Sequence, residues 1–156
     1  MRAAACVFGL LALVALPAHA EIIGKATVID GNTLEIAGQR IRLHRIAAPE
    51  PDQTCRWPNK VIPCGRIAGT AAMDLIAGVD RVVCATRGRE PSGGWIAACT
   101  ADGFDIDRNM VHPGRGLADQ SQSTVYVDVE NQAGKANRGL WKGEFVPRWT
   151  WRERGK

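Results

Sequence analysis

Three short β-type segments, joined by turns of only two or three residues, follow the first twenty residues of the chain. They are Ile22 to Ile29, Thr33 to Ile36 and Gln39 to Ile46. Asp30-Gly31-Asn32 and Ala37-Gly38 separate them, and sequences of this kind favour tight turns. In the third segment Ile41 and Leu43 alternate with arginines, as a strand with one buried face requires. This part of the chain therefore predicts three successive strands.

The remainder of the chain adds helical patterns and two further β-type runs. Apolar residues recur at helical spacing between Gly65 and Ile76, and Gly78 is suited to end that helix. The other expected elements are a proline-rich loop (47–64), two strands (81–86 and 95–100) and two helices (105–111 and about 123–136). Strands that precede and flank a few helices predict an α+β fold dominated by β structure. The expected fold is a small barrel with about three packed helices.

The first twenty residues have the pattern of a secretory signal peptide. Arg2 supplies a positive start, an almost wholly apolar run reaches Leu16, and Pro17 to Ala20 ends in the small-x-small pattern that signal peptidase recognises. The apolar run is too short to favour a membrane anchor. We therefore expect an exported protein that begins at Glu21 after processing and is periplasmic or secreted.

Four cysteines remain once Cys6 leaves with the signal peptide. An even number of cysteines in an exported chain favours disulfide bonds. Three pairings are open, and we prefer Cys55–Cys64, which closes a loop, and Cys84–Cys99, which joins two strands. The spacings contain no C-x-x-C pair, so they do not favour a zinc site.

The charge of the chain is mildly positive. Its 20 Lys and Arg residues against 16 Asp and Glu give a net charge of +4, and loss of Arg2 with the signal peptide lowers this to +3. Such a balance permits an anionic partner such as nucleic acid or acidic polysaccharide, without requiring one. The sequence sets no oligomeric state.

Three motifs occur together in a fixed order. They are Val28-Ile29-Asp30-Gly31-Asn32-Thr33-Leu34, Ile41 to Glu50 with the ending Ala47-Ala48-Pro49-Glu50, and Asn137-Arg138-Gly139-Leu140-Trp141. In this order and at these distances the chain resembles the staphylococcal-nuclease (thermonuclease) family over residues 22–146. Pro63-Cys64-Gly65 and the later cysteines are similar to exported members. Residues 21–146 would form the domain, and residues 147–156 a basic, aromatic tail.

The resemblance implies an OB-fold barrel of five strands with three helices, and a calcium-dependent phosphodiesterase acting on DNA and RNA. On that pattern Asp30 and the residue at position 32 are metal ligands, Glu50 activates water, and Arg42 binds the phosphate. Calcium prefers six to eight oxygen ligands, largely carboxylates, and guanidinium groups stabilise the charge on a phosphoryl group. Calcium is therefore the cofactor that the resemblance suggests.

The chain departs from the family pattern at three positions. Asn32 stands where an aspartate ligand is expected, Ala47 replaces a second carboxylate, and Gly94 lies where the turn between the last two strands carries a second arginine. Losing one electrostatic contact to a transition state costs roughly 10²–10³ in rate. Three residues near these positions could replace the missing base or metal ligands: His44, His112 and Asp52. Because His44 and Arg45 are neighbours in a strand, they point to opposite faces, and at most one of them faces the site.

These departures lead us to expect an exported thermonuclease-like domain that is catalytically impaired or inactive and binds nucleic acid or another anionic polymer. The expected anion-facing patch is Arg40, Arg42 and Arg45 on the third strand. The alternative is an active or slow calcium-dependent phosphodiesterase. The tail has two readings: Trp149 and Trp151 cover apolar barrel surface, or they stack on bases.

Overall fold

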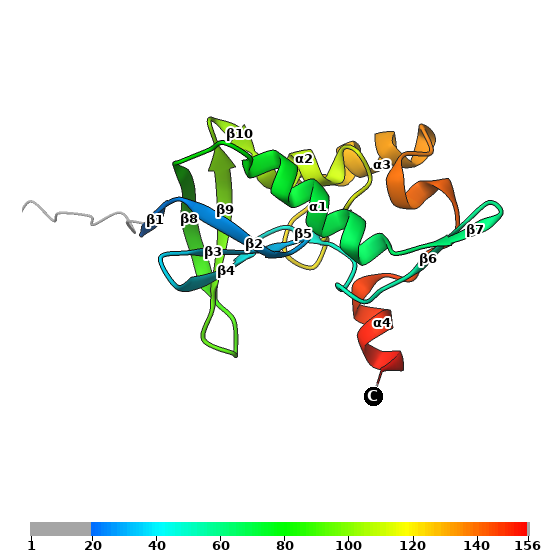
Figure 1. The fold of residues 1–156 in the computed structure, drawn as a ribbon, viewed down its shortest axis with the longest axis horizontal. Coiled ribbons are helices and arrows are strands. Elements are labelled where there is room, and N and C mark those ends of the chain that lie inside the picture. Colours follow the sequence, from blue (N-terminus) through cyan, green and yellow to red (C-terminus); the bar gives the residue numbers. More distant parts are fainter. Residues whose placement is uncertain (1–19, 156) are drawn as a thin grey trace, which may run out of the picture.

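The computed structural model describes residues 20–155, so residues 1–19 of the expected signal peptide lie outside the described residues. Figure 1 shows the strands of the main sheet gathered at one end of the molecule, with α1, α2 and α3 above them and α4 below. The elements are, in order, β1 (Glu21–Gly24), β2 (Ala26–Asp30), β3 (Thr33–Ile36), β4 (Gln39–Leu43), β5 (Ile46–Ala47), β6 (Cys55–Trp57), β7 (Lys60–Ile62), α1 (Cys64–Ile76), β8 (Val82–Arg89), β9 (Trp95–Ala101), β10 (Phe104–Asp105), α2 (Ile106–Val111), β11 (Leu117–Ala118), α3 (Val127–Lys135), the 3-10 helix η1 (Gly139–Lys142) and α4 (Arg148–Arg154).

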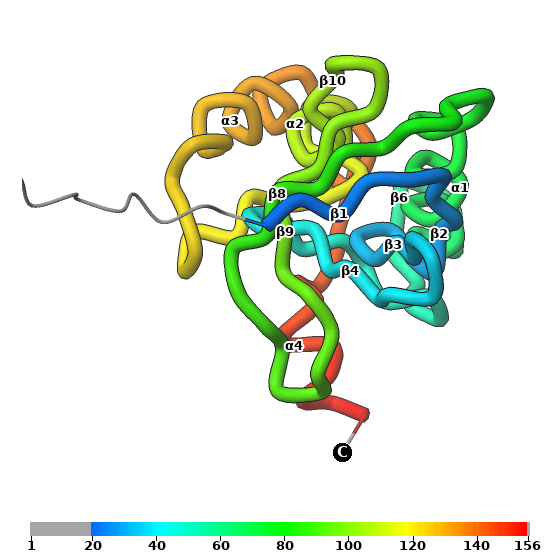
Figure 2. Tube along the Cα trace, turned by 90° about the vertical axis from the view of Figure 1, so that its left-hand side faces the viewer, coloured from blue at the N-terminus to red at the C-terminus, as the bar shows by residue number. Residues whose placement is uncertain are grey.

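The main sheet contains seven strands in the order β1-β8-β9-β4-β3-β2, with β10 added to β9. All pairings are antiparallel except that of β4 with β9. The two ends of this order, β1 and β2, are consecutive in the chain and are separated only by Lys25. Figure 2 shows the β8–β9 hairpin, in green, reaching toward the same end of the molecule as α4.

Alternation along the strands builds the core. Leu34, Ile36, Ile41 and Leu43 have almost no exposed surface, as expected for side chains on the inner face of a sheet. Helix α1 contributes Ala68 and other small residues, and α2 adds Ile106, Met110 and Val111 to the same core. The fold is thus mixed α/β and dominated by its sheet, as expected.

A second, smaller cluster joins the segment after β5 to the last third of the domain. It contains Cys55, Ile62, Leu117 and Leu140, with Trp141 packed against it. This cluster stabilises the β6–β7 hairpin. Because the hairpin lies within residues 47–64, the expectation of a loop throughout that range is wrong. The hairpin turns at Asn59, whose φ of 66° is the left-handed conformation that asparagine tolerates.

Both preferred disulfide bonds are present. Cys55 and Cys64 tie β6 to the start of α1 across 9 residues. Cys84 and Cys99 lie directly opposite each other on β8 and β9. Two disulfides are consistent with an exported protein. Within residues 20–155 we find no helix with the length and apolar character needed to cross a bilayer.

The helices differ from expectation at their ends and in number. Asp105 caps α2 through a bond from the Arg108 N–H to its carboxylate, in agreement with the expected helix at 105–111. Helix α3 begins at Val127, later than the expected start at Ser123 or Thr124. The tail forms a fourth helix, α4, where about three helices were expected.

Candidate functional site

The turn between β2 and β3 places two polar side chains in the protein interior. The Asp30 carboxylate accepts a hydrogen bond of 2.9 Å from the backbone N–H of Asn32, an arrangement that stabilises tight turns. The Asn32 side chain has no exposed surface, and its Nδ2 donates to the carbonyl of Ile46 at 3.2 Å. That bond fixes the amide, so that the Asn32 Oδ1 remains available as an acceptor.

A guanidinium from the other end of the chain uses this acceptor. The Arg148 Nη1 donates to the Asn32 Oδ1, and the Arg148 Nε donates to the Glu50 Oε1 at 2.5 Å. The Arg148 Nη2 lies 4.0 Å from the Asp30 Oδ2. Asp30, Asn32 and Glu50, hereafter the polar cluster, are thus brought together around Arg148, of whose side chain only 7% is exposed.

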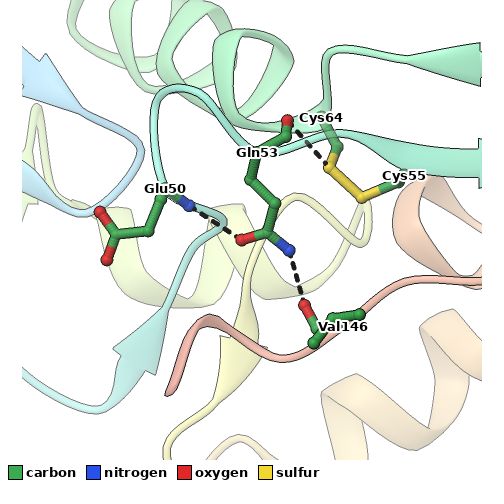
Figure 3. Close-up of a disulfide and its surroundings, with 5 residues drawn as sticks. All are labelled: Glu50, Gln53, Cys55, Cys64 and Val146. Atoms are coloured by element: carbon green, nitrogen blue, oxygen red, sulfur yellow. Dashed lines mark hydrogen bonds between the residues drawn. A yellow bond between two sulfur atoms is a disulfide. The ribbon is translucent and has the colours of Figure 1, made fainter. Parts of the chain in front are cut away.

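The loop that carries Glu50 is tied to the segment before α4. The Gln53 Oε1 accepts from the Glu50 N–H at 3.1 Å, and the Gln53 Nε2 donates to the Val146 carbonyl at 2.6 Å. Figure 3 shows this buried amide between the Glu50 loop and Val146, beside the Cys55–Cys64 bond. The Arg152 Nε also donates to the Glu50 Oε1. Two arginines of α4 therefore meet one glutamate.

The charges of two arginines balance those of the two carboxylates in the polar cluster. Arg148 and Arg152 stand against Asp30 and Glu50. Burial lowers the pKa of Arg148 from its ordinary value and the Arg152 charge adds to this, while the Glu50 and Asp30 carboxylates oppose it. An arginine remains protonated at neutral pH in such surroundings. The cluster therefore already contains its counter-charge.

Arg42 lies on β4 between two further carboxylates. Its Nη1 is 3.5 Å from the Glu90 Oε1, and its Nη2 is 3.8 Å from the Asp119 Oδ2. Both separations exceed that of a good charge-assisted hydrogen bond. Asp119 follows β11, which pairs with β5, and its N–H bonds to the Arg45 carbonyl.

Arg40, Arg42 and Arg45, the expected anion-facing patch, have different surroundings. Arg40 is exposed on β4. Arg45 adopts a φ of 119°, and its charge opposes the rise in the pKa of the buried Asp107. A positive φ at a residue with a side chain is strained and re-aims that side chain. Of the three, Arg42 alone lines the pocket described below.

The positions of the three departures are also clear. Ala47 is buried in β5, and Asn32 lies in the polar cluster. Gly94 directly precedes β9 in the β8–β9 hairpin, and a Cβ placed there would lie 3.1 Å from the Glu90 Oε2. A side chain at position 94 would therefore meet Glu90, the partner of Arg42.

The polar cluster does not fit calcium in this arrangement. It offers two carboxylates and one amide oxygen, and Arg148 occupies oxygens of all three residues. Calcium usually takes six to eight oxygens. Across residues 20–155, no three side chains of His, Cys, Asp or Glu converge as metal ligands do.

A pocket of about 680 Å³ lies beside the polar cluster. Aromatic and apolar side chains alternate with charged ones around it. Its lining residues are Arg42, Ala47, Leu117, Ala118, Asp119, Gln120, Ser121, Glu130, Trp141, Phe145, Pro147, Arg148, Trp149 and Arg152. Helix α4 therefore forms one wall, with Trp149 about half exposed.

The three candidate replacements for the missing base or ligands, His44, His112 and Asp52, are not among the residues that contact the polar cluster. Burial lowers the pKa of His44, and the charges of Arg45 and Arg87 lower it further, while the Asp119 charge opposes the shift. His112 is exposed and bonds Arg138 at 3.0 Å. Asp52 is exposed on the loop after Glu50.

The sequence did not indicate Arg148, Arg152, Glu90, Asp119 or Gln53 as parts of the site. The two arginines are four residues apart, a spacing that puts both on one face of a helix. That signal was present in the tail, but it could be used only if the tail were expected to be helical. The other three are ordinary loop residues in sequence.

The chain was compared with protein-family models and none matches. It is similar to the succinoglycan biosynthesis protein ExoI of Rhizobium meliloti (strain 1021), with 31% identity over 126 residues. The match covers 79% of this chain and 66% of that protein. The chain thus spans just under two thirds of the relative's length.

Proposed function

We propose that this chain is a thermonuclease-like domain that binds an anionic polymer without hydrolysing it. The observation that carries the proposal is the place of Arg148. Its guanidinium lies among Asp30, Asn32 and Glu50, where a calcium ion and a reacting phosphate would have to lie. Glu50 is engaged by two arginines, so it is poorly placed to accept a proton from water.

The strand order supports an OB-fold barrel. If β1 and β2 are one long strand interrupted at Lys25, that strand pairs with β8 at one end and β3 at the other. The path β1/β2-β3-β4-β9-β8 then returns to its start with five strands. A closed five-stranded sheet with a crossover helix is the OB-fold arrangement, and it matches the resemblance to the nuclease family.

The three departures argue against efficient hydrolysis. An amide at position 32 and a methyl group at position 47 leave fewer negative ligands, and position 94 offers no second guanidinium. Loss of an arginine that bridges a transferring phosphoryl group costs about 10³–10⁵ in rate. Such losses are not additive, but each of them alone cripples an enzyme.

The pocket beside α4 supports binding. Arg42 and Arg152 present cationic groups and Trp149 presents a ring. Arg42 meets its two carboxylates only at 3.5 and 3.8 Å, so donors remain for a ligand anion. Nucleic acid carries repeated phosphates beside planar bases, and acidic polysaccharide carries repeated anionic groups beside the C–H faces of its sugar rings, so both suit such a surface. The relative named for succinoglycan biosynthesis favours a glycan.

Export is part of the same proposal. Disulfides persist in oxidising compartments, and this domain has two of them, one in the main sheet and one beside the candidate site. A periplasmic or secreted domain would meet polysaccharide or released nucleic acid there.

The test is binding and cleavage by the purified, exported protein. Labelled single-stranded DNA, RNA of equal length, polygalacturonate and neutral dextran are titrated in chelator and in calcium. We expect saturable binding to at least one anionic polymer in chelator, and none to dextran. Trp149→Ala and Arg42→Met should each weaken binding by about tenfold, the effect of losing about 1.4 kcal/mol.

Matched controls are present in the same elements. Trp151→Ala changes α4 at a ring outside the pocket, and Arg40→Met changes β4 at an exposed arginine. Both should bind as the unchanged protein does. Calcium-dependent turnover of DNA or RNA would establish the phosphodiesterase alternative, and absence of binding to every anionic polymer would refute the proposal.

A further inference from the structure

Arg148 is the one buried residue of helix α4, and the more exposed Arg152 also reaches the body of the domain by donating to Glu50. Arg148 is the first residue of this seven-residue helix and is 7% exposed, whereas Arg152, one turn later, is 55% exposed. Trp149 and Arg152 face the pocket. The position of the pocket wall therefore depends on where Arg148 is held.

Arg148 is held in place by side-chain oxygens, and a cation stabilises the carboxylates among them. Two of its nitrogens donate to Glu50 and Asn32, and the third lies 4.0 Å from the Asp30 carboxylate. Asp30 and Glu50 expose only 7% and 15% of their side chains. Partly buried carboxylates without a nearby positive charge are unfavourable, because desolvation is then uncompensated.

We propose that Arg148 is the resident cation of the polar cluster and that this contact latches α4 in place as the wall of the ligand pocket. Arg148 is then a positioning residue, which acts through Trp149 and Arg152. The inference rests on the proposed function only where polymer binding is the readout. It reverses the expectation of a calcium site, since the chain itself supplies the positive charge.

A planar guanidinium suits this cluster better than calcium does. The acceptors on Glu50 and Asn32 are met by separate N–H groups of one fork, a geometry that guanidinium offers and a spherical ion does not. Two carboxylates and an amide fall short of a calcium coordination shell. A cluster emptied of Arg148 should therefore accept free guanidinium ion more readily than calcium.

The test is chemical rescue of Arg148→Ala in the full exported chain. The variant should melt at a lower temperature and bind the polymer at least about tenfold more weakly, because the competent position of α4 is then only partly populated. About 10 mM guanidinium chloride, far below denaturing concentrations, should restore part of both losses, since a ligand of the folded state stabilises it. Equal sodium chloride is the ionic-strength control.

Two further variants complete the design. Arg154→Ala removes an exposed arginine from the same helix and should neither weaken binding nor respond to guanidinium. Arg148→Lys keeps the charge but loses the fork, and should fall between the unchanged protein and Arg148→Ala. It also serves as the test if Arg148→Ala does not fold.

The outcomes are separable. Unchanged polymer affinity and melting temperature in Arg148→Ala would overturn the latch. So would losses that guanidinium does not reverse beyond the sodium control, or calcium binding by the unchanged protein. If the unchanged protein binds no polymer, the proposed function fails, while rescue of the melting temperature still tests the latch.

Discussion

The Arg148 guanidinium places a positive charge beside two carboxylates and one amide oxygen. Removing one member of a buried ion pair typically costs about 3–5 kcal/mol, because the remaining charge is left without a partner. Asn32 contributes a neutral oxygen to this group while its Nδ2 stays on the Ile46 carbonyl. An asparagine at this turn is therefore compatible with an internal cation of charge +1.

Asp107 presents the opposite case, a buried carboxyl group without hydrogen-bond partners among the described residues. Burial and, to a smaller extent, the Asp105 charge raise its pKa to about 8, against the opposing charge of Arg45. The folded state thus binds a proton that the unfolded state has lost above its ordinary pKa of 3.8. Stability should fall as pH rises from about 4 to 8, by up to about 1.4 kcal/mol per unit.

The first prediction is that Asp107→Asn removes this pH dependence. Relative to the unchanged protein, the variant should gain unfolding free energy progressively between pH 4 and pH 8, measured by urea denaturation at several pH values. Asp128→Asn, an exposed change on α3, should show no such trend. Parallel curves for Asp107→Asn and the unchanged protein would show that Asp107 titrates normally.

At the scale of the secondary-structure elements, the sequence pattern predicted those strands and helices that short-range interactions stabilise. The expected strand Thr33 to Ile36 is confirmed as β3, and the expected helix at 65–76 is α1 with one more residue at its start. The β6–β7 hairpin was missed because its strands are three residues each. They are held by a disulfide and by bonds between Arg56 and Glu144, which no local pattern reveals.

The second prediction contrasts two glycines of α1. A Cβ at Gly65 would lie 1.7 Å from the Glu50 carbonyl oxygen, whereas one at Gly69 meets nothing within 4 Å. Gly65→Ala should therefore displace the Glu50 loop and destabilise the domain by about 2 kcal/mol or more. Gly69→Ala should stabilise it by about 0.5–1 kcal/mol through helix propensity. Thermal and urea unfolding measure both, and equal effects would contradict the close approach at Gly65.

The third prediction concerns the two disulfides. Replacing either cysteine pair with serine should lower the unfolding free energy by about 3 kcal/mol, as expected for loops of this size. Thiol titration of the unfolded, unreduced protein should find almost no free thiol. Loss of Cys55–Cys64 should also weaken polymer binding, since that bond braces the Glu50 loop (Figure 3). Four free thiols would refute the claim.

At the scale of the whole molecule, the site depends on contacts between distant parts of the chain. Arg148 and Asn32 are 116 residues apart in sequence, and Gln53 meets Val146 across 93 residues. The sequence motifs identified Asp30, Asn32 and Glu50, which the structure places around one group. They could not identify Arg148, because a tail that folds back differs from an exposed basic tail only in its tertiary contacts.

The last prediction follows from that long-range contact. The thermonuclease pattern that the chain resembles would be completed by Asn32→Asp, Ala47→Asp and Gly94→Arg, but a third carboxylate beside Arg148 would hold α4 more tightly. We therefore expect the triple change alone to give little cleavage of DNA in calcium. Adding Arg148→Ala should raise cleavage by at least about 10², the scale of one restored electrostatic contact. Arg154→Ala on the triple background is the control. Equal cleavage with and without Arg148 would mean that this arginine does not compete with a metal ion, and that the missing side chains alone limit the reaction.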